Sequence, residues 1–344
     1  MSFFKKSHLK ISFIFKKTWP VLRIILSILL LTKAVSQIDW PSLQTALPQI
    51  EFSWILLAIS LLLLANILAG IRWGLLMKSG GFHQKLAFFI RLYFSGSLLN
   101  QGLPTTIGGD SYRAISSNQN NHHAAKSTNQ QLNDELNFKN ATPRLRQSFY
   151  IVILDRTLGL AGNSLLGAIG LILGGKTLGS WAVNAGYLLL TGMMIGAILL
   201  ALSLYWNKTQ ILFKKITEKA HLYHAYKVTQ QAWGFPHLVI QLPVAILIHL
   251  LTLAAFWACL KACHLNAPIE ALMIGMPALG LLLMLPISIS GWGLREATLA
   301  GVLSLWGMDS SLVILSSIIY GAITLMTFLP GLPQLLKRQS SHQS

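Results

Sequence analysis

Two ten-residue stretches, at residues 104–113 and 286–295, carry the clearest chemical signal in the chain. They read PTTIGGDSYR and PISISGWGLR, and both fit the pattern Pro-x-[Ser/Thr]-Ile-x-Gly-x-x-x-Arg. In both places a proline ends an apolar run, small residues turn the chain, and an arginine follows. A guanidinium group offers a planar fork of N–H donors that matches phosphate geometry. Arg113 and Arg295 are therefore candidate ligands for an anion.

The turns add backbone donors to each candidate site. A half-helix is predicted to begin near Asp110 in the first stretch and near Trp292 in the second. The unpaired N–H groups at a helix start, together with the positive end of the helix dipole, favour an anionic group such as phosphate. The two chain breaks are therefore interpreted as two half-sites that face one cavity.

Other ionisable residues lie inside apolar segments, where they are costly and usually face a partner or a wet cavity. Asp155 and Arg156 lie in FYIVILDRTLGL, and Glu296 directly follows Arg295. Adjacent residues on a helix point about 100° apart, so Asp155 and Arg156 are not expected to neutralise each other. Pairing across helices is expected instead, for example between Asp155 and Arg295, and a second such pair would join Glu296 to Arg113. The alternative is that these groups form fixed interhelical salt bridges without a ligand.

The composition is that of an integral membrane protein. Of 344 residues, 53% are hydrophobic and 11% are charged, whereas about 25% are charged in soluble domains. The formal charge is +17, but lysine and arginine cluster at 5–23, 72–91, 113–146 and 208–227, and the connections between these clusters are nearly free of them. This asymmetry follows the positive-inside rule and predicts a cytoplasmic membrane location with both termini cytoplasmic. It argues against a nucleic-acid partner.

No metal or cofactor site is predicted. The histidines have no acidic or cysteine companions at ligand spacing, and Cys259 and Cys263 are expected to be small core residues. His249 is expected to make a polar contact within the helix bundle. The basic N-terminus lacks a small-residue cleavage site, so it is expected to lead into an uncleaved helix rather than to act as a signal peptide.

Six segments are long and apolar enough to cross a membrane, because a helix needs about 20 apolar residues to do so. Two further apolar stretches, 86–103 and 269–306, contain the repeated motif and do not fit as single crossings. A re-entrant hairpin, which enters and leaves on the same side, accommodates each stretch and keeps every basic loop inside. The alternative is that proline and glycine merely kink two spanning helices. The predicted spans are 19–35, 54–77, 149–173, 181–206, 238–260 and 311–332.

The predicted fold is an all-α polytopic membrane protein with six full spans plus two re-entrant hairpins in two inverted repeats. Each repeat crosses three times, so the second repeat, at about 180–335, is inverted relative to the first, at about 19–174. Non-helical backbone at membrane depth lines a cavity or is buried in protein. The whole chain, 1–344, is predicted to form one membrane domain, in which the Asn/Gln-rich residues 114–146 are a flexible cytoplasmic linker.

Three stretches, in this order, resemble the transmembrane, flippase-like domain of the lysylphosphatidylglycerol synthase family: NQGLPTTIGGDSYRA, LDRTLGL and LPISISGWGLREA. The resemblance covers nearly the whole chain. The cytosolic aminoacyl-transferase domain of full-length synthases has no counterpart here, so the chain resembles a stand-alone member and aminoacylation is not implied. The motif positions and the charged residues together give the predicted substrate-binding set: Asn100, Gly108, Gly109, Asp110, Arg113, Asp155, Arg156, Ser288, Gly291, Trp292, Arg295 and Glu296.

The resemblance implies movement of a lipid with a phosphate head group between leaflets. The first hypothesis is therefore a lipid flippase of a bacterial-type cytoplasmic membrane. Its substrate would be a phospholipid, including an aminoacylated one, or a polyprenyl-phosphate-linked lipid. The arginines would hold the phosphate, while the carboxylates attract an amine or relay protons. Two alternatives stay open: an accessory subunit of an envelope-lipid or glycan synthesis complex, and a membrane-embedded enzyme that modifies lipid head groups.

Overall fold

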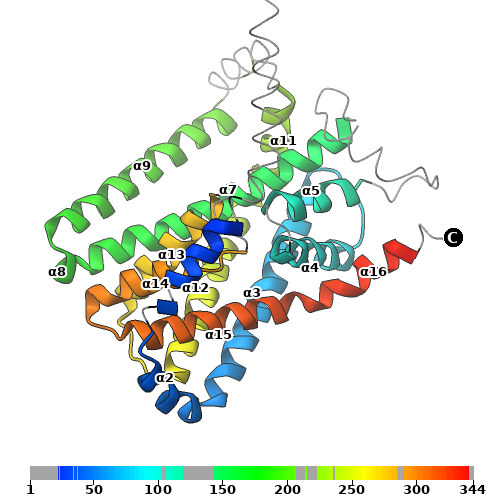
Figure 1. The fold of residues 1–344 in the computed structure, drawn as a ribbon. Helices are drawn as coiled ribbons and strands as arrows, with labels where there is room; N and C mark the ends of the chain where they lie inside the picture. The colour runs from blue at the N-terminus through cyan, green and yellow to red at the C-terminus, as the bar shows by residue number, and fades with distance from the viewer. Residues whose placement is uncertain are drawn as a thin grey trace, which may run out of the picture.

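The computed structural model describes residues 22, 24–33, 35–36, 38–102, 106–118, 143–206, 214, 223–234, 237–285, 288 and 290–340. Within these residues all regular structure is helical (Figure 1). Five helices are long and apolar enough to cross a membrane: Phe52–Ser79, Arg144–Leu173, Ser180–Leu204, His237–Ala262 and Ser310–Leu336. The predicted class, an all-α polytopic membrane protein, is confirmed at this level.

Five of the six predicted spans are present as such long helices. The sixth, 19–35, corresponds to a shorter apolar helix at Ile24–Lys33, and the start of that predicted span lies outside the described residues. In chain order the labelled helices are α2 (Trp40–Ala46), α3 (Phe52–Ser79), α4 (Leu86–Gly102), α5 (Thr106–Ser116), α7 (Pro143–Leu173), α8 (Gly175–Leu178), α9 (Ser180–Tyr205), α11 (Tyr223–Trp233), α12 (His237–Ala262), α13 (Ile269–Met284), α14 (Leu294–Leu303), α15 (Ser310–Phe328) and α16 (Leu332–Ser340).

The bundle has an apolar interior and an apolar exterior. In its main core, Phe256 of α12 packs edge-on against Tyr320 of α15, with ring centroids 5.6 Å apart, and Leu272 of α13 lies in the same cluster. Large side chains also point outward; Leu188 of α9, for example, is 74% exposed. A soluble protein does not present exposed apolar surface of this extent, so this exterior is suited to hydrocarbon.

Helices α4 and α5 form a tight hairpin at the position of the first predicted re-entrant segment. At 1.5 Å per residue, the 17 residues of α4 and the 11 residues of α5 span about 25 Å and about 16 Å, less than the roughly 30 Å hydrocarbon core. Gly109 makes the close approach possible, because a Cβ at this position would collide with the backbone oxygen of Gly96 and lie 2.6 Å from Asn100 Oδ1. In return, the Gly109 N–H donates to Asn100 Oδ1 at 2.8 Å.

Gly109→Ala should therefore destabilise the α4–α5 hairpin. Overpacking of this kind costs about 1–3 kcal/mol, whereas a glycine-to-alanine change within a helix otherwise stabilises by about 0.5–1 kcal/mol. Gly192→Ala in α9 is the matched control, because a Cβ there meets nothing within 4 Å. The measurement is the melting temperature of the purified protein in detergent, which should fall for Gly109→Ala and stay level or rise for Gly192→Ala. Equal melting temperatures for the two variants would contradict the close approach.

The second break lies between α13 and α14. Gly291 and Gly293 both adopt φ of +79°, and Ser290 adopts φ of +53°, so the chain reverses through left-handed backbone that favours glycine. Both half-helices begin at other residues than predicted. Helix α14 begins at Leu294, two residues after Trp292, because Gly293 is still non-helical. Helix α5 begins at Thr106, four residues before Asp110. Both motif prolines, Pro104 and Pro286, lie outside the described residues.

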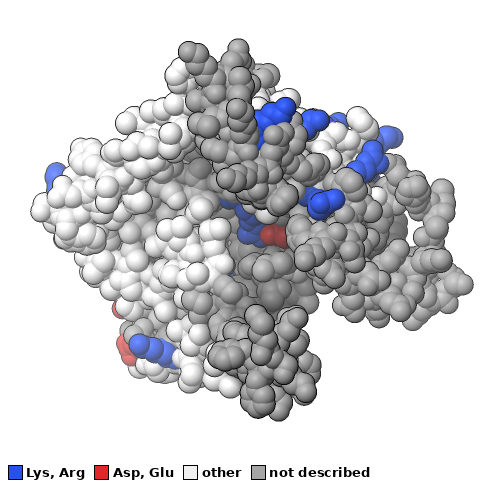
Figure 2. Space-filling model, turned by 90° about the horizontal axis from the view of Figure 1, so that it is seen from above, with Lys and Arg blue, Asp and Glu red and all other residues white. Residues whose placement is uncertain are grey.

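The connections gather at two ends of the bundle. At one end the N–H of Glu51, just before α3, donates to the carbonyl of Ala262 at the end of α12 at 3.2 Å, and α2 and α8 lie on this side (Figure 1). Helices α5, α11 and α16 lie toward the other end (Figure 1). Seen from above, many of the visible lysine and arginine side chains gather at the upper right of the view (Figure 2).

The predicted linker at 114–146 falls mainly outside the described residues. Its first residues, up to Ser116, complete α5, and its last residues, from Pro143, begin α7. Residues 119–142 are not described. The linker and the division of the chain into two inverted repeats stay predictions.

Candidate functional site

A cavity of about 400 Å³ lies among α3, α4, α5, α7, α12, α13, α14 and α15. This volume is within the range of about 300–1,000 Å³ for small-molecule sites. Charged side chains of both signs are visible at the base of a central hollow (Figure 2). The charged residues that line the cavity are Arg72, Asp110, Arg113, Asp155, Arg156 and Arg295.

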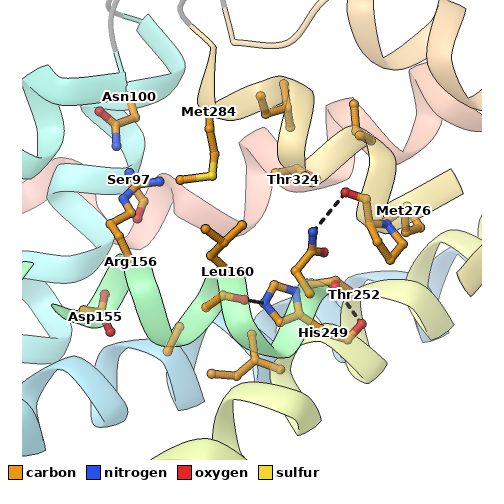
Figure 3. A pocket seen from close by; sticks show the side chains of 18 of the residues that line it. Ser97, Asn100, Asp155, Arg156, Leu160, His249, Thr252, Met276, Met284 and Thr324 are labelled. Carbon is orange, nitrogen blue, oxygen red and sulfur yellow. Dashed lines mark hydrogen bonds between the residues drawn. The ribbon is translucent and has the colours of Figure 1, made fainter. Parts of the chain in front are cut away.

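The carboxylate of Asp110 bridges two arginines at one end of the cavity. Its Oδ1 accepts from Arg113 Nη2 at 2.6 Å, one turn along α5. Its Oδ2 accepts from Arg156 Nε at 2.8 Å and lies 2.7 Å from Arg156 Nη2, on α7. The Arg113 side chain is 4% exposed, whereas that of Arg156 is 42% exposed. Arg156 is therefore the accessible member of this cluster, and Figure 3 shows it near Ser97 and Asn100.

The guanidinium group of Arg113 is held in an aromatic setting. It lies over the ring of Trp73 at 4.9 Å and over the ring of Tyr93 at 5.1 Å, distances at which cation–π attraction operates. Its Nη1 is buried and has no hydrogen-bond partner among the described residues, although it lies 3.8 Å from Asp155 Oδ2. One donor of a buried guanidinium is thus left without an acceptor.

Asp155 pairs with Arg72 of α3, which corrects the predicted pair of Asp155 with Arg295. Arg72 Nε and Nη2 donate to Asp155 Oδ1 at 3.1 and 2.8 Å, and Nη2 also donates to the Asp155 backbone oxygen at 3.2 Å. Both side chains are buried, at 8% and 6% exposure. As expected, Asp155 does not pair with its neighbour Arg156 in this structure.

Glu296 pairs with its neighbour Arg295, which corrects the predicted pair of Glu296 with Arg113. Glu296 Oε1 accepts from Arg295 Nε at 3.0 Å and from Nη2 at 2.7 Å, while Oε2 accepts from the Gly293 N–H at 2.6 Å. The long arginine side chain can reach an adjacent carboxylate although the two Cβ atoms diverge. The Gly293 N–H at the start of α14, a predicted anion donor, is therefore satisfied by the protein's own carboxylate.

A hydroxyl and a glycine complete this second cluster. Ser317 of α15 accepts from Arg295 Nε at 3.2 Å and donates to Glu296 Oε1 at 3.3 Å. A Cβ at Gly321, one turn further along α15, would collide with the Arg295 guanidinium. The guanidinium also lies over the Trp292 ring at 4.6 Å. The Arg295–Glu296 pair is thus enclosed by protein on several sides and neutral as a unit.

The second break contacts the end of α4. Ser290 Oγ donates to the backbone oxygen of Gln101, and both residues line the cavity. The end of α4 and the second break therefore contribute to one wall of the cavity. Half of the predicted site residues line the cavity, namely Asn100, Asp110, Arg113, Asp155, Arg156 and Arg295, whereas Gly108, Gly109, Ser288, Gly291, Trp292 and Glu296 do not.

Sequence reasoning missed Arg72 as a member of the site. Its position inside the predicted span 54–77 was a usable signal, because a charge within an apolar span needs a partner, but it was grouped with the basic loop that follows. Tyr93, Ser97 and Gln101 were also missed, and they line the cavity from α4. Their spacing in sequence carries no chemical signal until the hairpin brings α4 against α5.

At the opposite end of the cavity, apolar side chains lie beside polar groups that bond within the protein. Figure 3 shows Leu160 and Met284 between the charged end and the end that holds Met276. The polar groups at this end bond within the protein: His249 Nε2 lies 2.8 Å from the Gly159 oxygen, and Asn163 Nδ2 donates to the Pro277 oxygen at 2.9 Å. The polar contact predicted for His249 is thereby confirmed, and Leu160, Met276 and Met284 are among the apolar residues that line the cavity.

Within the described residues, no group of three or more His, Cys, Asp and Glu side chains could hold a metal ion. Neither the curated proteins nor the solved structures include a significant match to this chain. A family model, described as the lysylphosphatidylglycerol synthase TM region, matches residues 21–331. This match covers most of the chain and includes each of the three motifs and the whole charged cluster, and it confirms the resemblance derived from the motifs. The chain therefore belongs to the lysylphosphatidylglycerol synthase TM region family.

Proposed function

We propose that this protein moves a phosphate-containing lipid between the two leaflets of a cytoplasmic membrane. The observation that carries the proposal is the cavity itself, which has an arginine-rich end and an apolar end within a bundle of membrane-length helices. A lipid has the same two-part character. The charged end replaces the water around a head group, and the apolar end accepts the beginning of the acyl chains.

In this mechanism the arginines hold the phosphate and the carboxylates position the arginines. Arg156 reaches the ligand because it is accessible, and the buried Arg113 guanidinium adds positive charge behind it. Asp110 keeps both guanidinium groups side by side through its two oxygens. A hydrogen bond to a charged group contributes about 1.5–3 kcal/mol, so a contact with Arg156 offsets part of the cost of taking a phosphate out of water.

Orientation follows from the charge distribution. Cytoplasmic loops of membrane proteins are enriched in lysine and arginine, so the end that carries α11 and α16 faces the cytoplasm in this proposal. The α4–α5 and α13–α14 hairpins then act as re-entrant segments from opposite faces, in the inverted-repeat arrangement found in many transporters. Alternating exposure of the cavity to the two leaflets would come from rocking of these hairpins against the long helices.

The test is lipid translocation by purified protein in vesicles, followed with an acyl-labelled phosphatidylglycerol whose outer-leaflet label is quenched chemically. Wild-type protein should move the probe faster than empty vesicles do, and Arg156→Gln should slow the movement about tenfold, the equivalent of one charge-assisted hydrogen bond. Arg91→Gln is the matched control: Arg91 is exposed on α4, does not line the cavity, and bonds through Nε to the Ala87 oxygen.

Movement no faster than in empty vesicles, by protein that melts cooperatively, would overturn the flippase proposal and favour the accessory subunit. Equal rates for wild type and Arg156→Gln would remove the arginine grip from the mechanism. A melting curve for each variant separates loss of movement from loss of folded protein.

A further inference from the structure

The carboxylates at the cavity are all occupied by arginines. Asp110 uses one oxygen for Arg113 and the other for Arg156. Asp155 accepts two bonds from Arg72 on Oδ1, and its Oδ2 faces Arg113. Glu296, behind the wall, is fully buried against Arg295. Among the described residues, no cavity carboxylate is left to receive an ammonium group.

The aromatic faces next to the charged end are also occupied. An ammonium group without a carboxylate can be held over an aromatic ring. The rings of Trp73 and Tyr93 are already covered by the Arg113 guanidinium, at 4.9 and 5.1 Å. The ring of Trp292 is covered by Arg295 at 4.6 Å. Trp73 is fully buried, and one face each of Tyr93 and Trp292 is already taken by an arginine.

The charges of the described lining residues do not cancel. Arg295 is neutralised by Glu296, which leaves the guanidinium groups of Arg72, Arg113 and Arg156 facing the carboxylates of Asp110 and Asp155. Three positive charges against two negative charges give one uncompensated positive charge. The excess lies at Arg156, the accessible member of the cluster, because the Nη1 of Arg113 is buried and already faces Asp155 Oδ2.

The neutral polar residues beside these arginines suit oxygen atoms of a head group. Ser97, Asn100 and Gln101 line the cavity at this end. The Asn100 Oδ1 is taken by the Gly109 N–H, so Asn100 offers its amide donor to the cavity. Hydroxyl and amide groups of this kind bind the hydroxyl or ester oxygens of a ligand and carry no charge of their own.

We infer that the site selects a lipid with a single negative charge, a phosphodiester without an amine, over zwitterionic and aminoacylated lipids. This specificity rests on the proposed function in that the lipid selected is the lipid moved. The fully paired carboxylates also correct the expectation that they attract an amine. The bound species has one phosphate charge to match one excess guanidinium charge, and its uncharged head group lies against Ser97, Asn100 and Gln101.

The test is equilibrium binding of three lipids of equal chain length to detergent-solubilised protein: phosphatidylglycerol, phosphatidylethanolamine and phosphatidic acid. Wild-type protein should bind phosphatidylglycerol about tenfold more tightly than phosphatidylethanolamine, the value of one charge-assisted contact. Arg156→Gln leaves the cavity neutral and frees one oxygen of Asp110, so this ratio should fall to about one or lower. Arg91→Gln makes the same change of charge outside the cavity and should keep the wild-type ratio.

A variant that increases the excess positive charge of the cavity extends the test. Asp110→Asn raises the excess to two positive charges, so binding should shift toward phosphatidic acid, whose phosphomonoester carries about −1.5 to −2 at pH 7. If Asp110→Asn does not fold, the Arg156→Gln and Arg91→Gln pair still decides the question. A wild-type ratio of one, or the same fall in ratio for Arg91→Gln, would overturn the inferred specificity.

Two further arms separate this inference from its alternatives. Glycerophosphoglycerol, which has the head group but no chains, should compete at least tenfold more weakly than the lipid because it does not reach Met284 and Leu160; equal competition would identify a soluble anion as the ligand. Selective binding without movement in vesicles would overturn the proposed function and leave the specificity standing. Movement of all three lipids at equal rates, with equal binding, would overturn the inferred specificity and leave the proposed function standing.

Discussion

Asp155→Asn should lower the free energy of unfolding by about 3–5 kcal/mol, the usual cost of removing one partner from a buried ion pair. Asp155 is 4% exposed and takes two hydrogen bonds from Arg72, which is 7% exposed. Its Oδ2 also faces Arg113 at 3.8 Å. Asparagine keeps the shape but not the charge, so two buried guanidinium groups lose their shared counter-charge. The measurement is denaturant unfolding in detergent micelles, followed by tryptophan fluorescence.

The control is the double variant Arg72→Gln/Asp155→Asn, which removes both charges of the pair. It should recover a large part of the loss, since the penalty comes from the unpaired charge rather than from the absence of the bond. Additive losses in the two single variants and the double variant would show that Arg72 and Asp155 do not depend on each other. Arg156→Gln should leave stability nearly unchanged, because its side chain is 42% exposed.

Much of the membrane architecture could be predicted from hydrophobic length alone. The apolar runs at 54–77 and 181–206 became α3 and α9, because a long helix satisfies its own backbone where water is absent. Residues 149–173 became the apolar part of α7, which begins earlier, at Pro143. That extension is polar, so a hydropathy criterion did not include it.

The location of the site could be predicted from the sequence, but the ion pairs between its charged side chains could not. The repeated motif located Arg113 and Arg295, which both line the cavity, and the Ser290–Gln101 contact joins the second break to the end of α4. Which charges meet depends on the rotation of each helix about its axis and on interhelical distance, and neither is encoded in local spacing. Asp155 therefore turned toward Arg72 of α3 rather than toward Arg295.

The two motif copies differ in how the arginine of each copy is neutralised. In the first copy the counter-charge of Arg113 is shared with Arg156, so a positive charge is left over at an accessible side chain. In the second copy the residue after Arg295 is a glutamate, which closes the pair locally. One copy is suited to hold a ligand and the other to hold the wall of the cavity in place, although their sequence patterns match.

Glu296→Gln tests that division, and it should lower the free energy of unfolding by about 3–5 kcal/mol. Glu296 is 0% exposed, accepts two bonds from Arg295, and accepts a third from the Gly293 N–H. The single oxygen of glutamine at the third helical position can still accept the Gly293 N–H, so that bond is retained while the Arg295 guanidinium loses both its acceptor and its counter-charge. The unpaired Arg295 guanidinium would remain buried between Trp292, Ser317 and Gly321.

The double variant Arg295→Gln/Glu296→Gln should restore most of this stability, because no unpaired charge remains. Its lipid selectivity should match wild type, since the excess charge at Arg156 is unchanged. Unfolding in micelles and the phosphatidylglycerol-to-phosphatidylethanolamine binding ratio are measured on the same preparations. A restored fold with a lost ratio would assign Arg295 to the ligand rather than to the wall. A wild-type ratio in the restored fold would assign anion binding to the first motif alone. The neutral Arg295–Glu296 pair would then serve to hold α14 against α15 through Ser317 and Gly321.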